Sequence, residues 1–387
     1  MSHHLDTPLA AKSGQLFIDD LYVFRGERGS VFVLNVNSNI TGVDQEPGFH
    51  AEARYEFKVH FGGADIEPLT YRISFGEADG NGVQAMRLHV LTGVEAREDG
   101  AEGHFVLEGR TGETAQIGGT RLWAGRVKDP FYMDLTLPAK INGAIGQGTA
   151  VDLSDWQPAK AGNTFAGTSV ETIVLEVPDE GAVLTSGAEA GVWCATKLAT
   201  DAGGRRQNNR GGHPTMWPIF WPKDTDFSNP ANTRHPSRDL AEDGDHIAGR
   251  IAAVAKATGT SADLGGYGQI VSGRLFPDIL PYVVGSAAAY GFARGNVRPL
   301  ADNAPESMLF LVTGMAVPAG LKPSVALSPR TCAAASSPIS YPPDTRPVPA
   351  FRASTSRRQA ETPRTGCART PHRFVPRREC RVSALLR

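Results

Sequence analysis

The sequence predicts a mainly β fold, an antiparallel β-sandwich or jelly-roll-like domain with long loops and a few C-terminal helices, followed by a disordered tail. Three observations support this prediction. Apolar and polar residues alternate with a period of two, Gly-rich turns separate the alternating segments, and the composition changes near residue 325. A period of two is typical of strands that bury one face. Many short strands joined by such turns favour a sandwich or a jelly roll.

The clearest alternation lies at residues 55–61, Tyr-Glu-Phe-Lys-Val-His-Phe, and ends at Gly62-Gly63. The sequence Asp-Gly-Asn-Gly at 79–82 indicates a tight turn, because Gly and Asn adopt positive φ angles readily. Strands are expected at 16–24, 30–36, 55–61, 69–75, 83–91, 103–107, 120–124, 131–137, 170–177 and 191–195.

Helices are expected only after these strands. Ser237 or Asp239 can cap a helix that runs to about residue 258, and Gly259 is a typical residue for its C-terminus. Residues 302–306, Asp-Asn-Ala-Pro-Glu, predict a second helix start, since Pro and an acid are favoured in the first turn. Residues 138–163 have no clear period and are expected to be irregular.

The charge of the chain is divided unevenly. The chain has 39 Lys and Arg and 41 Asp and Glu. Residues 322–387 contain 13 of the basic residues and 3 of the acidic ones, a net charge of +10. Residues 1–321 are left with a net charge of −12. We therefore expect one β-rich domain at 1–325 and a Pro/Arg-rich disordered tail at 326–387, whose composition cannot bury enough apolar surface to fold. Such a tail could bind nucleic acid or acidic surfaces. Alternatively it is out-of-frame sequence, because GC-rich DNA read in the wrong frame yields this composition.

Several classes of function are disfavoured. The acidic body argues against nucleic-acid binding, and no apolar run is long enough for a membrane span. The N-terminus has no secretory signal pattern, so a cytoplasmic location is expected. No phosphate-binding loop, dinucleotide-binding fingerprint, zinc-protease motif or nucleophile elbow is present. Cys194 lies in an apolar run and is expected to be a buried, inert thiol rather than a nucleophile.

Several segments carry the landmarks of a known family. They are Ser-His-His at 2–4, Ile-Asp-Asp-Leu-Tyr-Val-Phe at 18–24, Asp-Pro-Phe-Tyr-Met-Asp-Leu at 129–135, Thr-Ile-Val-Leu-Glu-Val-Pro at 172–178, Gly-Val-Trp at 191–193 and the Gly-to-Asn segment at 295–303. Over residues 2–325 the chain resembles the bacterial family called domain of unknown function 4331. Residues 210–214, Arg-Gly-Gly-His-Pro, stand where this family tends to have Gly-Asn-Pro, so His213 departs from the family pattern. The family has no established chemistry to carry over, and many of its members are exported.

The first candidate site is a metal site built on the N-terminus. After removal of Met1, the free amine and His4 in third position can bind Cu²⁺ or Ni²⁺ in a square plane. Alternatively, N-terminal residues join buried acids in a folded site. A solvated N-terminus without a role, and Asp129 as a turn former, are the alternatives. The candidate metal ligands are His3, His4, Asp6, Asp19, Asp20 and Asp129.

The second candidate site is a long loop at 201–237, which is rich in Asn, Pro and Asp yet contains several aromatic residues. Its His and Asp side chains could bind a divalent ion, and its Trp side chains could form a platform for a small ligand. A self-hydrogen-bonded loop without a ligand is the alternative. The candidate ligand-binding residues are His213, Trp217, Trp221, Asp224, Asp226, Asn229, Asn232 and His235.

Three functional hypotheses follow from these candidates. The favoured one is a β-rich module that binds a metal or an unidentified small ligand. The second is a metal-assisted enzyme, a hydrolase or oxidoreductase, that uses the same His/Asp residues. The third is a structural or interaction domain without a site. A divalent metal ion is the one cofactor that the sequence suggests.

Overall fold

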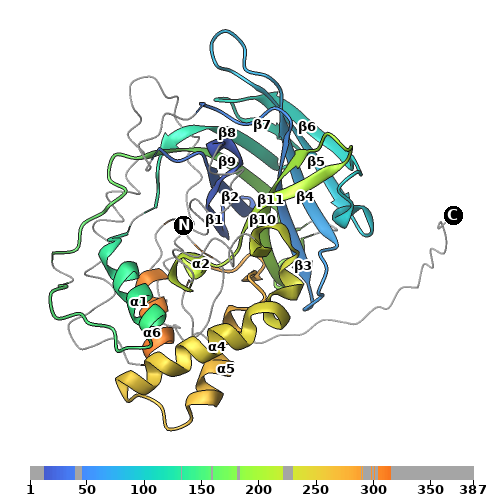
Figure 1. Ribbon diagram of the computed structural model, residues 1–387. Coiled ribbons are helices and arrows are strands. Elements are labelled where there is room, and N and C mark those ends of the chain that lie inside the picture. Colours follow the sequence, from blue (N-terminus) through green and yellow to red (C-terminus); the bar gives the residue numbers. More distant parts are fainter. Residues whose placement is uncertain are drawn as a thin grey trace, which may run out of the picture. The chain divides into compact units, whose positions relative to one another are not determined.

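The computed structural model describes residues 13–39, 46–131, 133–157, 160–180, 184–220, 230–288, 290, 298, 300 and 304–314 (Figure 1). The predicted tail at 326–387 lies outside these residues. The described residues form two antiparallel sheets and a smaller set of helices, which confirms the mainly β prediction. None of the helices in these ranges is long and apolar enough to cross a membrane.

The smaller sheet has five strands in the order β1-β2-β9-β8-β7. These strands are β1 (Ile18–Arg25), β2 (Gly29–Val36), β7 (Ala115–Ile117), β8 (Thr120–Lys128) and β9 (Ser169–Pro178). All of its pairings are antiparallel, and β2 and β9 pair residue by residue from Gly29 opposite Pro178 to Val36 opposite Glu171.

The larger sheet has seven strands, six in the order β11-β10-β3-β4-β5-β6, with β12 also paired to β10. They are β3 (Ala53–Phe61), β4 (Leu69–Phe75), β5 (Ala85–Thr92), β6 (His104–Arg110), β10 (Glu189–Ala199), β11 (Arg205–Gly211) and β12 (Leu280–Val283). The central strands β3 and β10 pair so that Lys58 lies opposite Trp193 and His60 opposite Gly191. This register brings together the side chains of the site described below.

The main hydrophobic core lies between the two sheets. Successive side chains of a strand point to opposite faces, so Tyr55, Phe57 and Val59 of β3 enter this core. Phe57 contacts Phe32 of the other sheet, with ring centroids 5.6 Å apart. The intervening side chains Glu56, Lys58 and His60 must therefore lie on the outer face of the larger sheet, and they are nevertheless buried.

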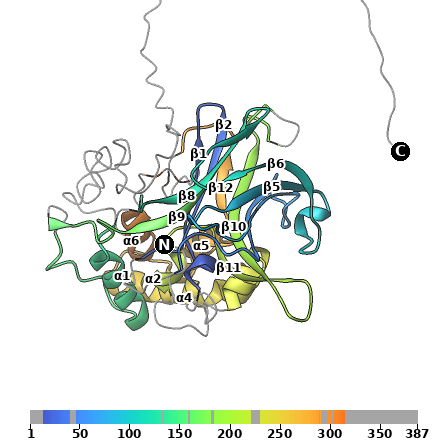
Figure 2. The ribbon, with the colours of Figure 1, turned by 90° about the horizontal axis from the view of Figure 1, so that it is seen from above.

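The helices form a second core of their own. They are α1 (Thr136–Gln147), α2 (Met216–Phe220), α4 (Asp239–Thr258), α5 (Leu264–Leu275) and α6 (Ala304–Thr313), with short 3-10 turns η2 (Gly14–Leu16), η3 (Glu95–Arg97) and η5 (Pro236–Arg238). Figures 1 and 2 show these α-helices gathered on one side of the sheets. The predicted helix at 239–258 is confirmed as α4, which ends at Gly259 with a left-handed φ of 71°.

Three predictions about local structure were wrong, and one of them is the irregular stretch expected at 138–163, where helix α1 continues to Gln147. Of the expected strand at 131–137, the described residues 131 and 133–137 form no strand, and helix α1 begins at Thr136 and buries Leu137, Ile141 and Ile145 at helical spacing. The expected loop at 201–237 contains strand β11, paired with β10, and helix α2. The polar sequence of β11 has little strand propensity, so backbone hydrogen bonds to β10 and tertiary contacts decide its structure.

Candidate functional site

The candidate site lies on the outer face of the larger sheet, where β3, β4 and β10 run side by side. Glu56, Lys58 and His60 of β3 are each no more than 3% exposed. The segment around Ala96 lies against Lys58, since the Ala96 carbonyl oxygen accepts hydrogen bonds from Lys58 Nζ at 3.2 Å and from Thr70 Oγ1 at 2.7 Å. The residues before α4 lie against the same face through His235.

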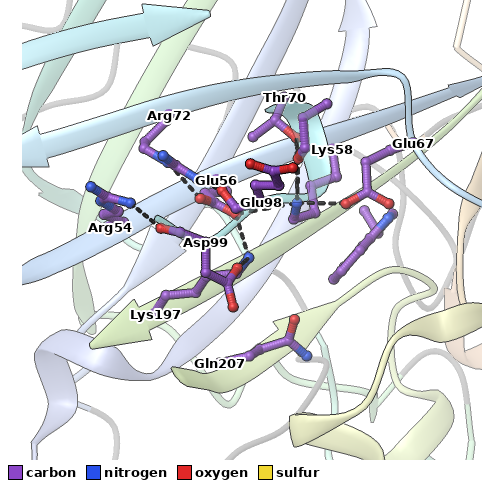
Figure 3. Close-up of polar contacts among 12 residues, drawn as sticks. Arg54, Glu56, Lys58, Glu67, Thr70, Arg72, Glu98, Asp99, Lys197 and Gln207 are labelled. Atoms are coloured by element: carbon purple, nitrogen blue, oxygen red, sulfur yellow. Dashed lines mark hydrogen bonds and ion pairs between the residues drawn. The ribbon is translucent and has the colours of Figure 1, made fainter. Parts of the chain in front are cut away.

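Glu56 is the centre of a buried ion network (Figure 3). Its carboxylate lies 2.7 Å from Arg72 Nε, 3.1 Å from Lys197 Nζ and 3.3 Å from Lys58 Nζ. Burial alone would raise the pKa of Glu56, but the charges of these three cations hold it well below its usual range. Glu56 is therefore ionised, and Lys58 joins it to the next carboxylate, Glu67.

Glu67 receives a donor at each carboxylate oxygen. Lys58 Nζ donates to Oε1 at 2.6 Å, and His235 Nε2 donates to Oε2 at 2.7 Å. Burial opposes ionisation of Glu67, but the hydrogen bond from His235 and the charge of Lys58 lower its pKa to about 2. Glu67 is thus a carboxylate at neutral pH, the form in which it can bind a cation.

His60 is held in one tautomer by two partners. Its Nδ1 lies 2.8 Å from the Ala64 carbonyl oxygen, which only accepts hydrogen bonds, so Nδ1 carries the proton. Its Nε2 accepts a hydrogen bond from Trp193 Nε1 at 2.9 Å. Burial lowers the pKa of His60, so the ring is neutral and its Nε2 has a lone pair.

His60, Glu67 and His235 converge on one point. Within the described ranges they form the one group of three or more His, Cys, Asp and Glu side chains whose ligand atoms all lie within 4.8 Å of one another. The Glu67 Oε2 atom lies 2.7 Å from His235 Nε2 and 3.9 Å from His60 Nε2. Tetrahedral zinc, with bonds of about 2.0–2.2 Å, needs neighbouring ligand atoms about 3.3 Å apart, which lies between these two separations.

Comparison of the chain with models of protein families, with curated proteins and with solved structures finds no match. Evidence about the site therefore comes from its own geometry. Two His and one carboxylate are a donor set that binds zinc and other divalent first-row metals. The Nδ1–H of His60 donates to a backbone carbonyl, an outer contact that metal-binding His residues usually have.

Sequence reasoning found one member of this group, His235, and missed His60 and Glu67. The alternation at 55–61 places Glu56, Lys58 and His60 on one face, which is a detectable signal. A charged strand face is normally solvated, so the pattern alone does not indicate a buried site. Glu67 follows a Gly-rich turn, and nothing in its neighbouring sequence relates it to His235, 168 residues later.

Other residues of the second candidate site lie in a separate buried network. Trp217 Nε1 donates to Asp278 Oδ2 at 2.8 Å, and the backbone N–H of His213 donates to Asp278 Oδ1 at 2.6 Å. Trp217 belongs to the helical core and is only 1% exposed, and Asn232 is also buried. Trp221, Asp224, Asp226 and Asn229 lie outside the described residues.

The first candidate site is described only in part, since His3, His4 and Asp6 lie outside the described residues. Asp19 Oδ2 accepts a hydrogen bond from the Ser38 N–H at 3.0 Å, and Asp20 forms an ion pair with Arg298. Asp129 stands in a turn, where Oδ1 accepts from the Phe131 N–H at 2.9 Å. Burial and the nearby charges of Asp20 and Asp19 raise the pKa of Asp129 to about 8.

Cys194 of β10 is fully buried, which confirms the predicted burial of its thiol. Burial raises the pKa of its thiol well above the usual value. Because the thiolate is the reactive form of cysteine, Cys194 is inert in this position.

Proposed function

We propose that this protein binds a divalent first-row transition metal, with Zn²⁺ as the representative ion, through His60, Glu67 and His235. The observation that carries the proposal is the convergence of their ligand atoms within 4.8 Å. His60 comes from β3, Glu67 from the β3–β4 connection and His235 from the segment before α4. A bound ion would therefore join segments of the chain that are far apart in sequence.

The protonation states of the three residues favour metal binding. Metal ligands must be deprotonated carboxylates and neutral imidazoles. Glu67 has a pKa of about 2, and burial lowers the pKa of His60. For Nε2 of His235 to bind the ion, the ring must change from the Nε2–H to the Nδ1–H tautomer, with solvent carrying the proton. Nδ1 then donates to the Ser237 hydroxyl in place of accepting from the Ser237 N–H. The His235 side chain is 26% exposed, so solvent reaches the ring.

Calorimetric titration of the full chain with Zn²⁺ tests the proposal. We expect one Zn²⁺ per chain, with the affinity reduced about 100-fold or more in His235→Ala, because loss of a ligand exceeds the 10–100-fold typical of outer contacts. All proteins carry His3→Ala and His4→Ala, so that the N-terminal residues contribute nothing. His104→Ala is the matched control, since His104 is an exposed residue of β6 outside the group.

Equal zinc affinity in His235→Ala and His104→Ala would contradict the proposal, and so would no binding by the parent protein.

The same samples test a second candidate function, metal-assisted hydrolysis. Three protein ligands leave the fourth tetrahedral position of zinc to a water molecule, which the metal can activate. Zinc-dependent turnover of p-nitrophenyl acetate that is absent in His235→Ala favours the hypothesis that the protein is a hydrolase. Stoichiometric binding without turnover favours a binding protein.

One further proposal rests on the sequence alone. The motifs at 2–4 and 129–135 support membership of the domain of unknown function 4331 family, a bacterial family.

A further inference from the structure

Trp193 touches three residues of the candidate site at once. Its indole N–H donates to His60 Nε2 at 2.9 Å. Its ring meets the ring of His235 edge-on, with centroids 5.3 Å apart, and lies 5.5 Å from Lys58 Nζ. Trp193 is 1% exposed, so its indole N–H has no access to bulk water.

The hydrogen bond from Trp193 occupies the atom that a metal would need. His60 has one lone pair for a ligand, on Nε2, because Nδ1 donates its proton to the Ala64 carbonyl oxygen. A metal bond and an indole hydrogen bond cannot share this lone pair. Binding through His60 Nε2 must therefore break the contact with Trp193 and leave a buried N–H in need of a new acceptor, which costs free energy.

We propose that Trp193 competes with the metal for His60 Nε2 and so sets the affinity of the site. This inference rests on the proposed function. In the metal-free protein the indole N–H donates to His60 Nε2, which keeps the ring neutral and in one orientation. When the ion binds, Trp193 loses this partner, so metal occupancy changes the environment of a buried aromatic ring in β10. A weakly binding metal, or one at low concentration, does not displace the indole.

Zinc titration of Trp193→Phe tests this competition. Phe keeps an aromatic ring in β10 but has no N–H donor, so we expect the affinity for Zn²⁺ to rise about tenfold, equivalent to about 1.4 kcal/mol. Trp123→Phe is the matched control. Trp123 is equally buried but belongs to β8 of the other sheet, and its replacement is expected to leave the zinc affinity unchanged.

A second measurement follows the indole itself. In the nitrogen–proton NMR spectrum of the parent protein, the indole resonance that is missing in Trp193→Phe should shift when Zn²⁺ is added. An affinity that is unchanged or weaker in a folded Trp193→Phe protein, or an indole resonance indifferent to bound zinc, would overturn the competition while leaving the metal site intact. If neither protein binds zinc, both the proposed function and this inference are wrong. Zinc binding by Trp193→Phe alone would support the competition but contradict zinc binding by the unmodified protein, which is the proposed function.

Discussion

At the residue scale, the larger sheet shows that charged side chains can be buried when each has partners of opposite charge. Glu56 is completely buried, and three cations lie within 3.3 Å of its carboxylate. Removing one member of such a network leaves its partners buried with less opposite charge around them, whereas an exposed ion pair returns to water at little cost. The network therefore holds the face of β3 in one arrangement next to Glu67.

We expect Glu56→Gln to reduce the free energy of unfolding by about 3–5 kcal/mol, because Arg72, Lys58 and Lys197 would lose their shared negative charge. Glu108→Gln is the matched control. Glu108 pairs with Arg87 in the same sheet, but both side chains are more than 60% exposed, so a change below about 1 kcal/mol is expected. Urea denaturation measures both values. Similar losses in the two variants would show that the buried network adds no special stability.

At the element scale, α4 and α5 pack closely because a glycine stands at their contact. A Cβ atom on Gly268 of α5 would lie 2.3 Å from the carbonyl oxygen of Ala248 in α4, whereas one on Gly273 of the same helix would have no heavy atom within 4 Å. Helix α4 follows directly after the segment that carries His235. The packing of α5 thus supports an element next to the candidate site.

Two substitutions in α5 are expected to change stability in opposite directions. Gly268→Ala should destabilise the protein by about 1–3 kcal/mol, because the helices must move apart or strain. Gly273→Ala should stabilise it by up to about 1 kcal/mol, because alanine is the better helix former and has space there. Thermal unfolding followed by circular dichroism would reveal the difference. A Gly268→Ala protein as stable as the parent would mean that the two helices do not need this close contact.

At the scale of the whole molecule, polar contacts join the larger sheet to the segments around the helices. Arg210 of β11 pairs with Asp239 of α4 at 2.6 Å, and Glu67 pairs with His235 at 2.7 Å. Several groups near these contacts are buried in their neutral or paired form, including His213. Stability of the fold should therefore depend on pH through these groups.

Burial lowers the pKa of His213 from 6.5 to about 4. Between these values the unfolded chain takes up a proton on His213 and the folded protein does not, so stability is full above pH 6.5 and falls as the pH falls to 4. We expect His213 to contribute a loss of about 3 kcal/mol over this window. Urea unfolding at pH 7 and pH 4.5 should show a smaller difference for His213→Asn than for the parent. An identical pH dependence would contradict the neutral, buried state of His213.

The sequence predicted most of the β architecture because the position of a strand follows from a local rule. Side chains in a strand alternate between two faces, so a buried face is visible as a period of two. Nine of the expected strand segments, among them 55–61 and 170–177, overlap strands of the structure. Helix α4 was also predictable, since Gly259 marks its C-terminus, but its N-cap is Arg238, without a side-chain cap hydrogen bond, and not the expected Ser237 or Asp239. Strand β11 was not, because its polar residues become a strand only through pairing with β10.

By itself the sequence determined the fold class, the alternate side chains of β3 that face the core between the sheets, and the burial of Cys194. Tertiary structure alone decided the candidate site. His60, Glu67 and His235 meet because β3, its following turn and the segment before α4 converge on one face, and no local pattern encodes contacts across 168 residues. The tertiary structure also decided the chemistry of the site. The protonation of His60 and Glu67, and the competing donor on Trp193, depend on which charges and donors are buried beside them.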